Sequence, residues 1–462
     1  MSWQIEGFLE TRNGHLTIDG VDAVELAKRF GSPLFVYSEA RIRRNIERLK
    51  LVGDAIGCGF KLSYAAKAMS TLGILRAVKD ADCDIEVNSG GELWKALKAG
   101  FNGSQINFNG TSKEAWEIDL AIENDIYAIQ ADSLFELSLI DEAARRLGKR
   151  ANVSLRLVPE IASDTHSGLQ TALLTSKFGM MPEEAYRAVA EFADSPYVNI
   201  CGVHLHIGSQ NPDPSVYVSA FETLFASLLR IFNETGQSLE HINLGGGFPV
   251  KYLAADSLVP DEKQRAMLAA VYEPADAIGP AWDAVRRAAK AADAEHLLDG
   301  ITLLLEPGRS IIADAGVCLT TVRNAKSRPT DDGGEDHWIL TDAGFNILLS
   351  METYKWYYRL ISAERADAPH DAPYKAAGPL CDGGDVYFDI EGEGRLPDHR
   401  LLPKGVEPGE TLALLNCGAY SLAQASQYNA RFLPAVVLIG RDGEPTLIRR
   451  RDTFKDLVSA DL

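Results

Sequence analysis

The sequence predicts an α/β protein built from a (β/α)8 barrel of the TIM type and a mainly antiparallel β domain. Eight short apolar runs alternate with helical patterns up to Glu306, which is typical of parallel strands joined by crossover helices. After Pro307 the pattern changes to β-like segments separated by polar turns. A chain of 462 residues is long enough for two such domains.

The N-terminal segment is mixed in character. β-like pieces at 16–18 and 34–36 flank a short helical pattern at 24–30. Ser38 is a suitable N-cap for a basic amphipathic helix over 41–51. We therefore expect the first barrel elements to follow this segment.

Barrel strands are expected wherever a short apolar run stands between helical patterns. The eight expected strands cover residues 59–65, 83–88, 105–109, 127–131, 152–158, 200–206, 241–244 and 303–306. Helical patterns fill most of the gaps, at 91–99, 112–123, 134–147, 183–193 and 217–235. The gap from 251 to 300 is longer than an ordinary crossover, so we expect an insertion there. The barrel domain is thus expected to cover residues 35–310.

The C-terminal part, residues 311–462, is expected to form the β domain. Its β-like segments lie at 317–323, 338–342, 374–380, 412–415, 435–439 and 446–449. Residues 328–336 are rich in aspartate and glycine, which predicts a solvated hairpin tip. Helical patterns are sparse in this part, near 345–357 and 421–427.

Composition and charge exclude several classes of function. The net charge of −19 argues against nucleic acid and anionic membranes as partners. None of the six cysteines forms a Cys-x-x-Cys pair, so no zinc site or redox motif is indicated, and we expect no metal. Scattered thiols fit a reducing compartment. The N-terminus lacks a signal pattern and no apolar run could span a bilayer, so we expect a cytoplasmic protein.

Chemically reactive residues gather at the ends of the expected barrel strands. In a (β/α)8 barrel, function is carried by the loops that follow the strand C-termini. Six of the expected strands end in or precede such residues: Lys67, Ser89-Gly-Gly-Glu92, Arg156, His204-Leu-His206, Gly245-Gly-Gly247 and Glu306-Pro-Gly-Arg309. Six sets on one rim are difficult to attribute to packing.

Each set has a chemical use and a structural alternative. Lys67 at the end of a buried strand would be desolvated, which lowers a lysine pKa and suits a Schiff-base nucleophile, whereas the alternative is a surface lysine. Gly245–Gly247 would let backbone N–H groups approach a phosphate, or would form only a tight turn. Arg309 could bind the same phosphate, or could be a surface arginine.

The remaining two residues complete a recognisable set. Glu306 ends an apolar strand and needs a partner, which either a protonated ring nitrogen or Arg309 could supply. His206 could stack on an aromatic ring, or could be a satisfied core residue. A Schiff-base lysine, a phosphate site and a carboxylate for a ring nitrogen are together what pyridoxal 5'-phosphate requires. The sequence therefore predicts this cofactor.

The same motifs carry a resemblance to a known family. The chain contains, in order, Tyr64-Ala-Ala-Lys67, Ser89-Gly-Gly-Glu92, His206-Ile-Gly-Ser209, Gly245-Gly-Gly-Phe-Pro249, Glu306-Pro-Gly-Arg309, Gly378-Pro-Leu-Cys381 and Cys417-Gly-Ala-Tyr420. They resemble the alanine-racemase-type (fold type III) pyridoxal phosphate decarboxylases, above all diaminopimelate decarboxylases and their D-lysine/D-ornithine decarboxylase relatives. The resemblance implies a carbon–carbon lyase in which residues 1–34 join the β domain. It also implies a homodimer with shared active sites.

The resemblance implies roles for individual residues. Catalytic roles fall on Lys67, which would hold the cofactor covalently, Glu306 beside the pyridine nitrogen, His206 stacked on the ring, and Cys381, an acid from the partner subunit. A thiol suits that last role because its reference pKa of roughly 8.5 leaves it mostly protonated at neutral pH. The other implied cofactor contacts are Glu86, Arg156, Ser209, Gly245, Gly246, Gly247, Gly308, Arg309 and Tyr420. The implied substrate contacts are Arg309, Ser350, Tyr354, Asp382, Asp385 and Tyr420.

The sequence departs from the family in two places. The family usually has Cys-Glu where this chain has Cys381-Asp382. Diaminopimelate decarboxylases also carry an Arg-Pro-x-x-Tyr motif that grips the distal carboxylate of the substrate. When Asp342-Ala-Gly344 is aligned, the arginine falls on Ser350, whereas the tyrosine is kept as Tyr354. A serine cannot replace a bidentate guanidinium.

These departures leave the substrate open. The first hypothesis is decarboxylation of a diamino acid at a D-configured carbon, with D-lysine or D-ornithine as substrate. The second is meso-diaminopimelate decarboxylase making L-lysine, with Lys355, Arg359 or Arg365 holding the far carboxylate. Weaker alternatives are a decarboxylase of a siderophore or antibiotic intermediate and a cofactor-free regulatory homologue.

Overall fold

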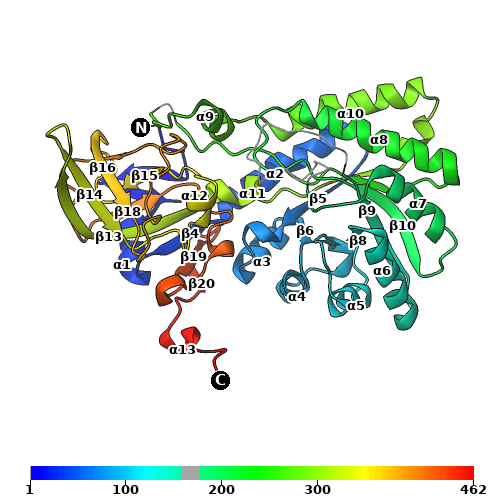
Figure 1. The fold of residues 1–462 in the computed structure, drawn as a ribbon, viewed down its shortest axis with the longest axis horizontal. Helices are drawn as coiled ribbons and strands as arrows, with labels where there is room; N and C mark the ends of the chain where they lie inside the picture. The colour runs from blue at the N-terminus through cyan, green and yellow to red at the C-terminus, as the bar shows by residue number, and fades with distance from the viewer. Residues whose placement is uncertain (1, 159–175, 255) are drawn as a thin grey trace. The chain divides into compact units, whose positions relative to one another are not determined.

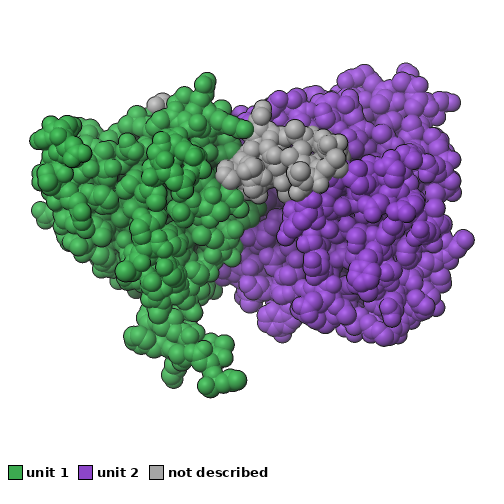
Figure 2. All heavy atoms as spheres, in the orientation of Figure 1, with its two compact units in different colours: residues 1–44, 250–269, 309–462 green, residues 45–249, 270–308 purple. Residues whose placement is uncertain are grey.

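The chain, analysed as a computed structural model, is described over residues 2–158, 176–254 and 256–462. It divides into two compact units (Figure 2), the first formed by residues 1–44, 250–269 and 309–462 and the second by residues 45–249 and 270–308. These units differ from the expected domain limits at residues 35–44, 250–269 and 309–310, which lie in the first unit.

The second unit is a closed barrel of eight parallel strands (Figure 1), which confirms the predicted architecture. The strands are β5 (Gly59–Ala65), β6 (Asp84–Val87), β7 (Ile106–Phe108), β8 (Ala128–Ala131), β9 (Ala151–Arg156), β10 (Val198–His204), β11 (His241–Asn243) and β12 (Thr302–Leu305). The last strand pairs with the first, Leu305 opposite Leu62, and this pairing closes the barrel. All eight predicted strands are present, with ends within two residues of the prediction.

One helix leads into the first barrel strand and others connect the barrel strands. They are α2 (Glu39–Ile56), α3 (Leu72–Asp80), α4 (Gly90–Ala99), α5 (Ala115–Glu123), α6 (Leu134–Leu147), α7 (Pro182–Phe192), α8 (Val216–Thr235) and α10 (Pro274–Ala291). Helix α4 shows why they begin and end where they do. The Ser89 side chain accepts a hydrogen bond from the Glu92 backbone N–H, and Gly100 ends the helix in the left-handed conformation. The expected insertion contributes α10 to this unit.

The first unit is built on a nine-stranded sheet that is mainly antiparallel, as predicted. Its strands are β4 (Leu34–Ser38), β13 (Gly316–Pro329), β14 (Glu335–Thr341), β15 (Leu360–Ser362), β16 (Ala372–Ala377), β17 (Arg400–Leu402), β18 (Thr411–Leu414), β19 (Ala435–Ile439) and β20 (Pro445–Arg449). Two pairings, β14 with β16 and β19 with β4, are parallel. A smaller sheet contains β1 (Leu9–Arg12), β2 (His15–Ile18) and β3 (Val21–Asp22).

Short helices complete the first unit. They are α1 (Ala23–Phe30), α9 (Glu262–Ala269), α11 (Arg309–Ile312), α12 (Leu349–Thr353) and α13 (Phe454–Leu457). Apolar residues of α1 pack with those of β4, β13 and β19 in one buried cluster. The predicted hairpin tip lies where β13 turns into β14. No described helix combines the length and the apolar composition that crossing a bilayer requires.

Candidate active site

A row of buried polar side chains crosses neighbouring strands of the barrel. The register pairs Arg156 at the end of β9 with His204 of β10, and His204 with Asn243 of β11. Residues in register share one face of a sheet. All three side chains are buried, although polar groups are rarely buried without a partner. This row therefore identifies the barrel end at which polar chemistry is concentrated.

Two buried carboxylates lie beside this row and share one amide. The Asn109 Nδ2 group donates to Glu86 Oε1 and to Glu306 Oε2, both at 2.8 Å. Asn243 Nδ2 donates to the other oxygen of Glu306, Oε1, at 2.7 Å. Glu306 is 5% exposed and follows the apolar strand β12. The two amides thus fix the orientation of the Glu306 carboxylate.

Burial raises the pKa of both carboxyl groups. For Glu306, the hydrogen bonds from Asn243 and Asn109 oppose this effect, and the positive charges of Lys67 and Arg156 oppose it further. For Glu86, the charge of Lys67 opposes burial while the charge of Glu306 adds to it. Among the described residues, Glu86 Oε2 has no hydrogen-bond partner. Such a pair favours a further cation or proton beside it, and the protonated nitrogen of a pyridine ring would fit.

Lys67 lies on a 3-10 turn, Ala66–Ala68, directly after β5. The turn is held by the Tyr64 hydroxyl, which donates to the Met69 carbonyl at 3.0 Å. The flanking alanines are buried, but Lys67 is exposed, so the expectation that burial desolvates it is wrong. The side chain stands beyond the end of the strand because the turn begins there. Its charge still influences Glu86, Glu306 and both histidines.

The two histidines of the rim are held in their neutral form. Burial lowers the pKa of His204 and of His206 well below the usual range, and nearby cations, Lys67 and Arg156 among them, lower both further. His206 Nδ1 accepts the Gly246 backbone N–H at 3.3 Å, so the ring hydrogen lies on Nε2. His204 Nε2 is 3.4 Å from Glu306 Oε2 without hydrogen-bond geometry. A neutral imidazole at 206 can stack on a flat ring without carrying charge to it.

The glycine turn after β11 is required by close contacts. A Cβ on Gly245, whose φ is +64°, would lie 2.4 Å from His206 Nδ1, and a Cβ on Gly246 would lie 2.7 Å from the Glu306 carbonyl. The Gly245 N–H already donates to Asn243 Oδ1 at 2.8 Å, and that of Gly246 to His206. These two glycines therefore shape the site by lacking side chains, and their expected role as phosphate donors stays a prediction.

Arg156 is held at the end of β9 by a carboxylate and a ring. Its Nε lies 3.9 Å from Asp132 Oδ1, and its guanidinium carbon lies 4.2 Å from the centre of the Phe178 ring. Burial lowers its pKa, while Asp132, Glu306 and Glu86 favour the charged form. Ser209 lies on the loop after β10, next to Gly208, whose φ is +102°. Both residues stand at the rim, as expected.

In the first unit, Arg309 is enclosed by aromatic residues. It begins α11, directly after Gly308, and its Nη1 donates to the Tyr252 hydroxyl at 3.1 Å. Its guanidinium carbon lies 4.2 Å from the centre of the Trp356 ring and 4.8 Å from that of Tyr420. Arg309 and Tyr420, two expected cofactor and substrate contacts, are thus neighbours. Stacking leaves the planar donors of the guanidinium oriented for an anion.

Cys381 stands on an exposed loop of the same unit. Its backbone N–H donates to Asn429 Oδ1 at 2.7 Å. Asp385 anchors this loop, because its two oxygens accept hydrogen bonds from the backbone N–H groups of Phe345 and Leu380, each at 2.8 Å. Both oxygens of Asp385 are thus engaged within the unit, and its expected contact with substrate stays a prediction. Asp382 is exposed and accepts a hydrogen bond from the Tyr428 hydroxyl at 3.2 Å.

Ser350 is buried in α12, where the family motif would have an arginine. Its hydroxyl lies 3.5 Å from the Tyr420 carbonyl and from Gln424 Oε1. Tyr354 follows at the end of the helix. The three cations considered as substitutes are paired within this unit, Lys355 with Glu352 at 3.1 Å, Arg359 with Asp256 at 2.6 Å and Arg365 with Glu410 at 2.8 Å. Each has therefore a carboxylate partner already.

Four residues of these clusters were not singled out from the sequence: Asn109, Asn243, Tyr252 and Trp356. The two asparagines lie at the ends of expected apolar strands, 105–109 and 241–244. A polar amide at the end of an apolar strand is the signal that could have found them, because it needs a buried partner. Tyr252 and Trp356 belong to segments whose proximity to Arg309 only the fold reveals.

Comparisons with known proteins agree with this arrangement. Residues 40–313 match the family described as "Pyridoxal-dependent decarboxylase, pyridoxal binding domain". The diaminopimelate decarboxylase of Methanocaldococcus jannaschii is 36% identical over 460 residues, covering 98% of this chain and 96% of that protein. The diaminopimelate decarboxylase of Bacillus subtilis is 32% identical over 457 residues, with 98% and 96% covered.

A solved structure gives the same result for the fold. The crystal structure of the M. jannaschii diaminopimelate decarboxylase superimposes with a TM-score of 0.82 at 35% identity, and 98% of this chain and 97% of that chain are covered. The likeness therefore extends over the barrel and the β unit alike. The chain belongs to the fold type III pyridoxal-dependent decarboxylases, carbon–carbon lyases that use pyridoxal phosphate.

Proposed function

We propose that this enzyme decarboxylates meso-diaminopimelate at its D-configured carbon and releases L-lysine. The observation that carries the proposal is the likeness over nearly the whole chain to proteins named diaminopimelate decarboxylase, at 32–36% identity. One of the similar structures is described as a co-complex with L-lysine. The likeness to these proteins includes the β unit, where substrate contacts are expected, and therefore favours meso-diaminopimelate as the substrate.

The barrel residues fit the needs of the cofactor. Pyridoxal phosphate supplies an electron sink for the bond between the α-carbon and the leaving carboxylate. Glu306 suits the ring nitrogen because its two oxygens are fixed by Asn109 and Asn243. Gly245 and Gly246 pack so closely against His206 and Glu306 that a side chain at either glycine would clash. Lys67, exposed on its turn, is the amine that would hold the cofactor and exchange with the substrate amine.

The proton that replaces the lost carboxylate is assigned to Cys381 in this proposal. Cys381 is exposed on the loop that Asn429 and Asp385 hold in place. A thiol is protonated at neutral pH and can deliver its proton to carbon. By the family resemblance the thiol serves the partner subunit of a homodimer, which makes the enzyme inactive as isolated chains. We also propose that the reaction takes place in the cytoplasm, because scattered free thiols suit a reducing compartment.

A second candidate, D-lysine or D-ornithine, rests on one specific observation. The family's clamp for a distal carboxylate is replaced by Ser350, and Lys355, Arg359 and Arg365 each have a carboxylate partner. A distal ammonium would need no clamp and could approach Asp382. The similar proteins give no support to this specificity, so it stands behind meso-diaminopimelate.

Release of labelled CO2 separates the two candidates. Equal low concentrations of meso-diaminopimelate, D-lysine and D-ornithine are compared by kcat/KM. The proposal expects meso-diaminopimelate to be turned over fastest, with L-lysine as the product. Ser350→Arg is the matched variant, because a restored guanidinium should raise the preference for the diacid about tenfold, the effect of one charge-assisted pair. Faster turnover of either D-amino acid by the wild-type enzyme would reverse the order of the candidates.

A further inference from the structure

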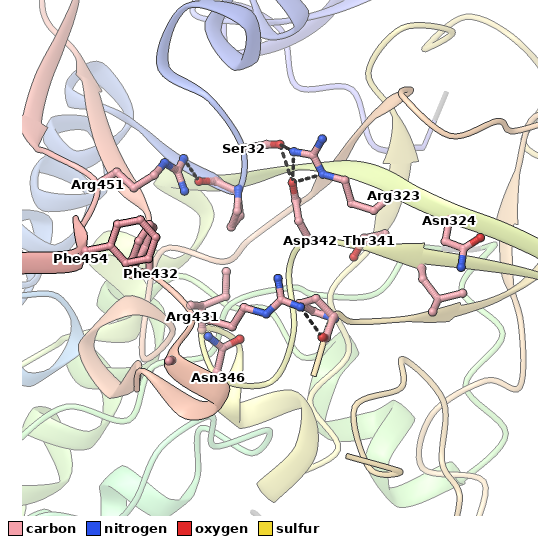
Figure 3. A pocket seen from close by; sticks show the side chains of 15 residues that line it. Ser32, Arg323, Asn324, Thr341, Asp342, Asn346, Arg431, Phe432, Arg451 and Phe454 are labelled. Atoms are coloured by element: carbon pink, nitrogen blue, oxygen red, sulfur yellow. Dashed lines mark hydrogen bonds and ion pairs between the residues drawn. The ribbon is translucent and has the colours of Figure 1, made fainter. Parts of the chain in front are cut away.

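A cavity of about 610 Å³ lies in the first unit, and none of the described residues that line it was assigned above to catalysis (Figure 3). Its volume is in the range of ordinary small-molecule sites. Arg323, Arg431 and Arg451 line it, together with Phe432 and Phe454. Figure 3 shows Arg451 on the side of the two phenylalanines and Arg323 on the opposite side, with Arg431 between them.

The cavity carries a formal excess of positive charge. Arg323 is neutralised by Asp342, since its Nη2 and Nε lie 2.7 and 2.9 Å from the carboxylate oxygen Oδ2. Asp342 is the one carboxylate among the described residues that line the cavity. Arg431 and Arg451 instead donate to carbonyl groups, of Pro379 at 2.8 Å and of Pro33 at 2.7 Å. A carbonyl satisfies a hydrogen bond but does not balance a charge, so the three arginines and one aspartate of the lining leave a formal charge of +2 in a chain of net charge −19. Asp342 also attracts Arg451, and Asp385, which does not line the cavity, attracts Arg431, so this excess is partly offset.

An apolar wall stands beside these charges. Phe432 and Phe454 meet edge to face with their ring centres 5.1 Å apart, and Phe454 is 79% exposed. A large aromatic side chain is seldom left so exposed in a soluble protein without a contact to make. Two cations next to two rings match a molecule that carries an anionic group of charge two on an aromatic or apolar body.

The loop that lines this cavity also holds the Cys381 loop. Residues 428–432, named here the bridging loop, supply Arg431 and Phe432 to the cavity. The same loop supplies Asn429 to the Cys381 backbone, and Arg431 to the carbonyl of Pro379, two residues before Cys381. Asn429 and Ala430 have φ angles of 54° and 55°, which non-glycine residues rarely adopt. Strain of this kind is kept where a backbone position serves a function.

We propose that this cavity binds a small molecule with a phosphate or equivalent dianion on an aromatic or apolar body, and that its occupation steadies the Cys381 loop. The dianion is held by Arg431 and Arg451, and the body rests on Phe432 and Phe454. A ligand bound to the free N–H groups of Arg431 fixes this side chain while Nη2 stays on Pro379. The functional meaning of that coupling rests on the role proposed for Cys381, but binding itself does not.

Phenylphosphate is a suitable probe for the binding. It is titrated calorimetrically into the enzyme loaded with pyridoxal phosphate, so that the cofactor's own phosphate site is filled. We expect saturable binding of one molecule per chain, weakened about tenfold or more by Arg451→Gln and by Phe454→Ala, since each removes a principal contact. Phe454 is exposed, so its replacement leaves folding intact. Arg441→Gln, on the turn between β19 and β20, is the matched control and should bind normally.

Three outcomes would overturn the site: no saturable binding, binding unaffected by both variants, or inorganic phosphate binding as tightly as phenylphosphate. The coupling is tested by the alkylation rate of Cys381, followed by peptide mapping. Saturating phenylphosphate should slow it about fivefold, the lower end of ordinary coupling between two sites. An unchanged rate would overturn the coupling. Neither measurement uses a substrate, so a wrong assignment of the reaction would leave both results readable.

Discussion

At the scale of single residues, Asn109 links two buried carboxylates of the barrel. One amide group supplies hydrogen bonds to two buried carboxylates, Glu86 and Glu306. Like-charged carboxylates in a buried site raise the pKa of each other. The amide therefore helps to keep Glu306 charged and oriented.

Replacing Asn109 by alanine should disturb the titration of Glu306. Its charged form loses a hydrogen bond, so its pKa rises and the acid limb of the pH profile of kcat/KM moves to higher pH. We expect kcat/KM to fall roughly 10- to 100-fold, because a hydrogen bond to a charged group contributes about 1.5–3 kcal/mol. Asn107→Ala is the control, since Asn107 is buried on β7, two residues before Asn109, and donates to Ser63 Oγ at 2.9 Å. An acid limb that stays in place would refute this role.

Asp385 gives a second prediction at this scale. Burial raises its pKa from 3.8 to about 6, although two backbone N–H groups favour the charged form. A carboxyl group whose pKa is higher in the folded state is penalised once it ionises, so its contribution to stability falls as the pH rises from about 4 to about 6. Relative to Asp385→Asn, the wild type should lose up to about 3 kcal/mol of unfolding free energy over that window.

The difference in unfolding free energy between the wild type and Asp385→Asn is measured by denaturant unfolding at pH 4.5 and pH 7, at one protein concentration. Groups other than Asp385 titrate alike in the two proteins and cancel in the difference. A difference that is independent of pH would show that Asp385 is ionised without penalty.

The sequence predicted residues whose type is rare at a strand end, such as Lys67 and Glu306, and the family resemblance added Cys381. It did not predict Asn109 or Asn243, because an asparagine is also common in loops. Their role depends on barrel closure, which brings β7, β11 and β12 to one point. The exposure of Lys67 was also missed, since a turn directly after a strand cannot be distinguished from its continuation by apolar content.

At the scale of elements, the glycine turn after β11 fixes how closely strand ends approach. Gly246→Ala would place a Cβ 2.7 Å from the Glu306 carbonyl, and this backbone atom cannot move away alone. We expect the free energy of unfolding to fall by about 1–3 kcal/mol, the usual cost of overpacking, and pyridoxal phosphate to bind more weakly.

Thermal unfolding and cofactor titration by absorbance measure both effects. Gly279→Ala is the control, because its Cβ would meet only the Ala55 Cβ, at 3.6 Å, within helix α10. If Gly246→Ala retained wild-type stability and cofactor affinity, the close packing of this turn would be irrelevant to the site.

The barrel strands were predictable because each is a short apolar run bounded by helical patterns. The position of β4 in the nine-stranded sheet could not be predicted. Its residues read as β-like, but its partners are β13 and β19, which lie far along the chain. Similarly, the helical pattern over 345–357 yields only α12, since Lys355, with a φ of 50°, cannot continue a right-handed helix.

At the scale of the whole molecule, the proposal requires a residue of each unit. Lys67 belongs to the barrel unit and Cys381 to the β unit, and the family resemblance assigns the two to different subunits of one site. Lys67→Ala and Cys381→Ala chains should each be inactive. Mixed together, they should recover up to about a quarter of wild-type activity, because half of randomly paired dimers then contain one intact site.

The matched control is a mixture of Lys67→Ala and Glu306→Ala chains. Both residues lie in the barrel unit, so no dimer of these chains contains an intact barrel and no activity should return. Failure of the first mixture, with subunit exchange demonstrated, would place Cys381 in the site of its own chain.

The rim of this barrel is proposed to hold pyridoxal phosphate through Lys67. Borohydride reduction of the loaded enzyme fixes the cofactor to whichever amine carries it, and peptide mapping then identifies that residue. We expect the pyridoxyl group on Lys67 and no labelling in Lys67→Ala. A label on another lysine, such as Lys61 beside Asp84 or Lys113 beside Glu136, would contradict it.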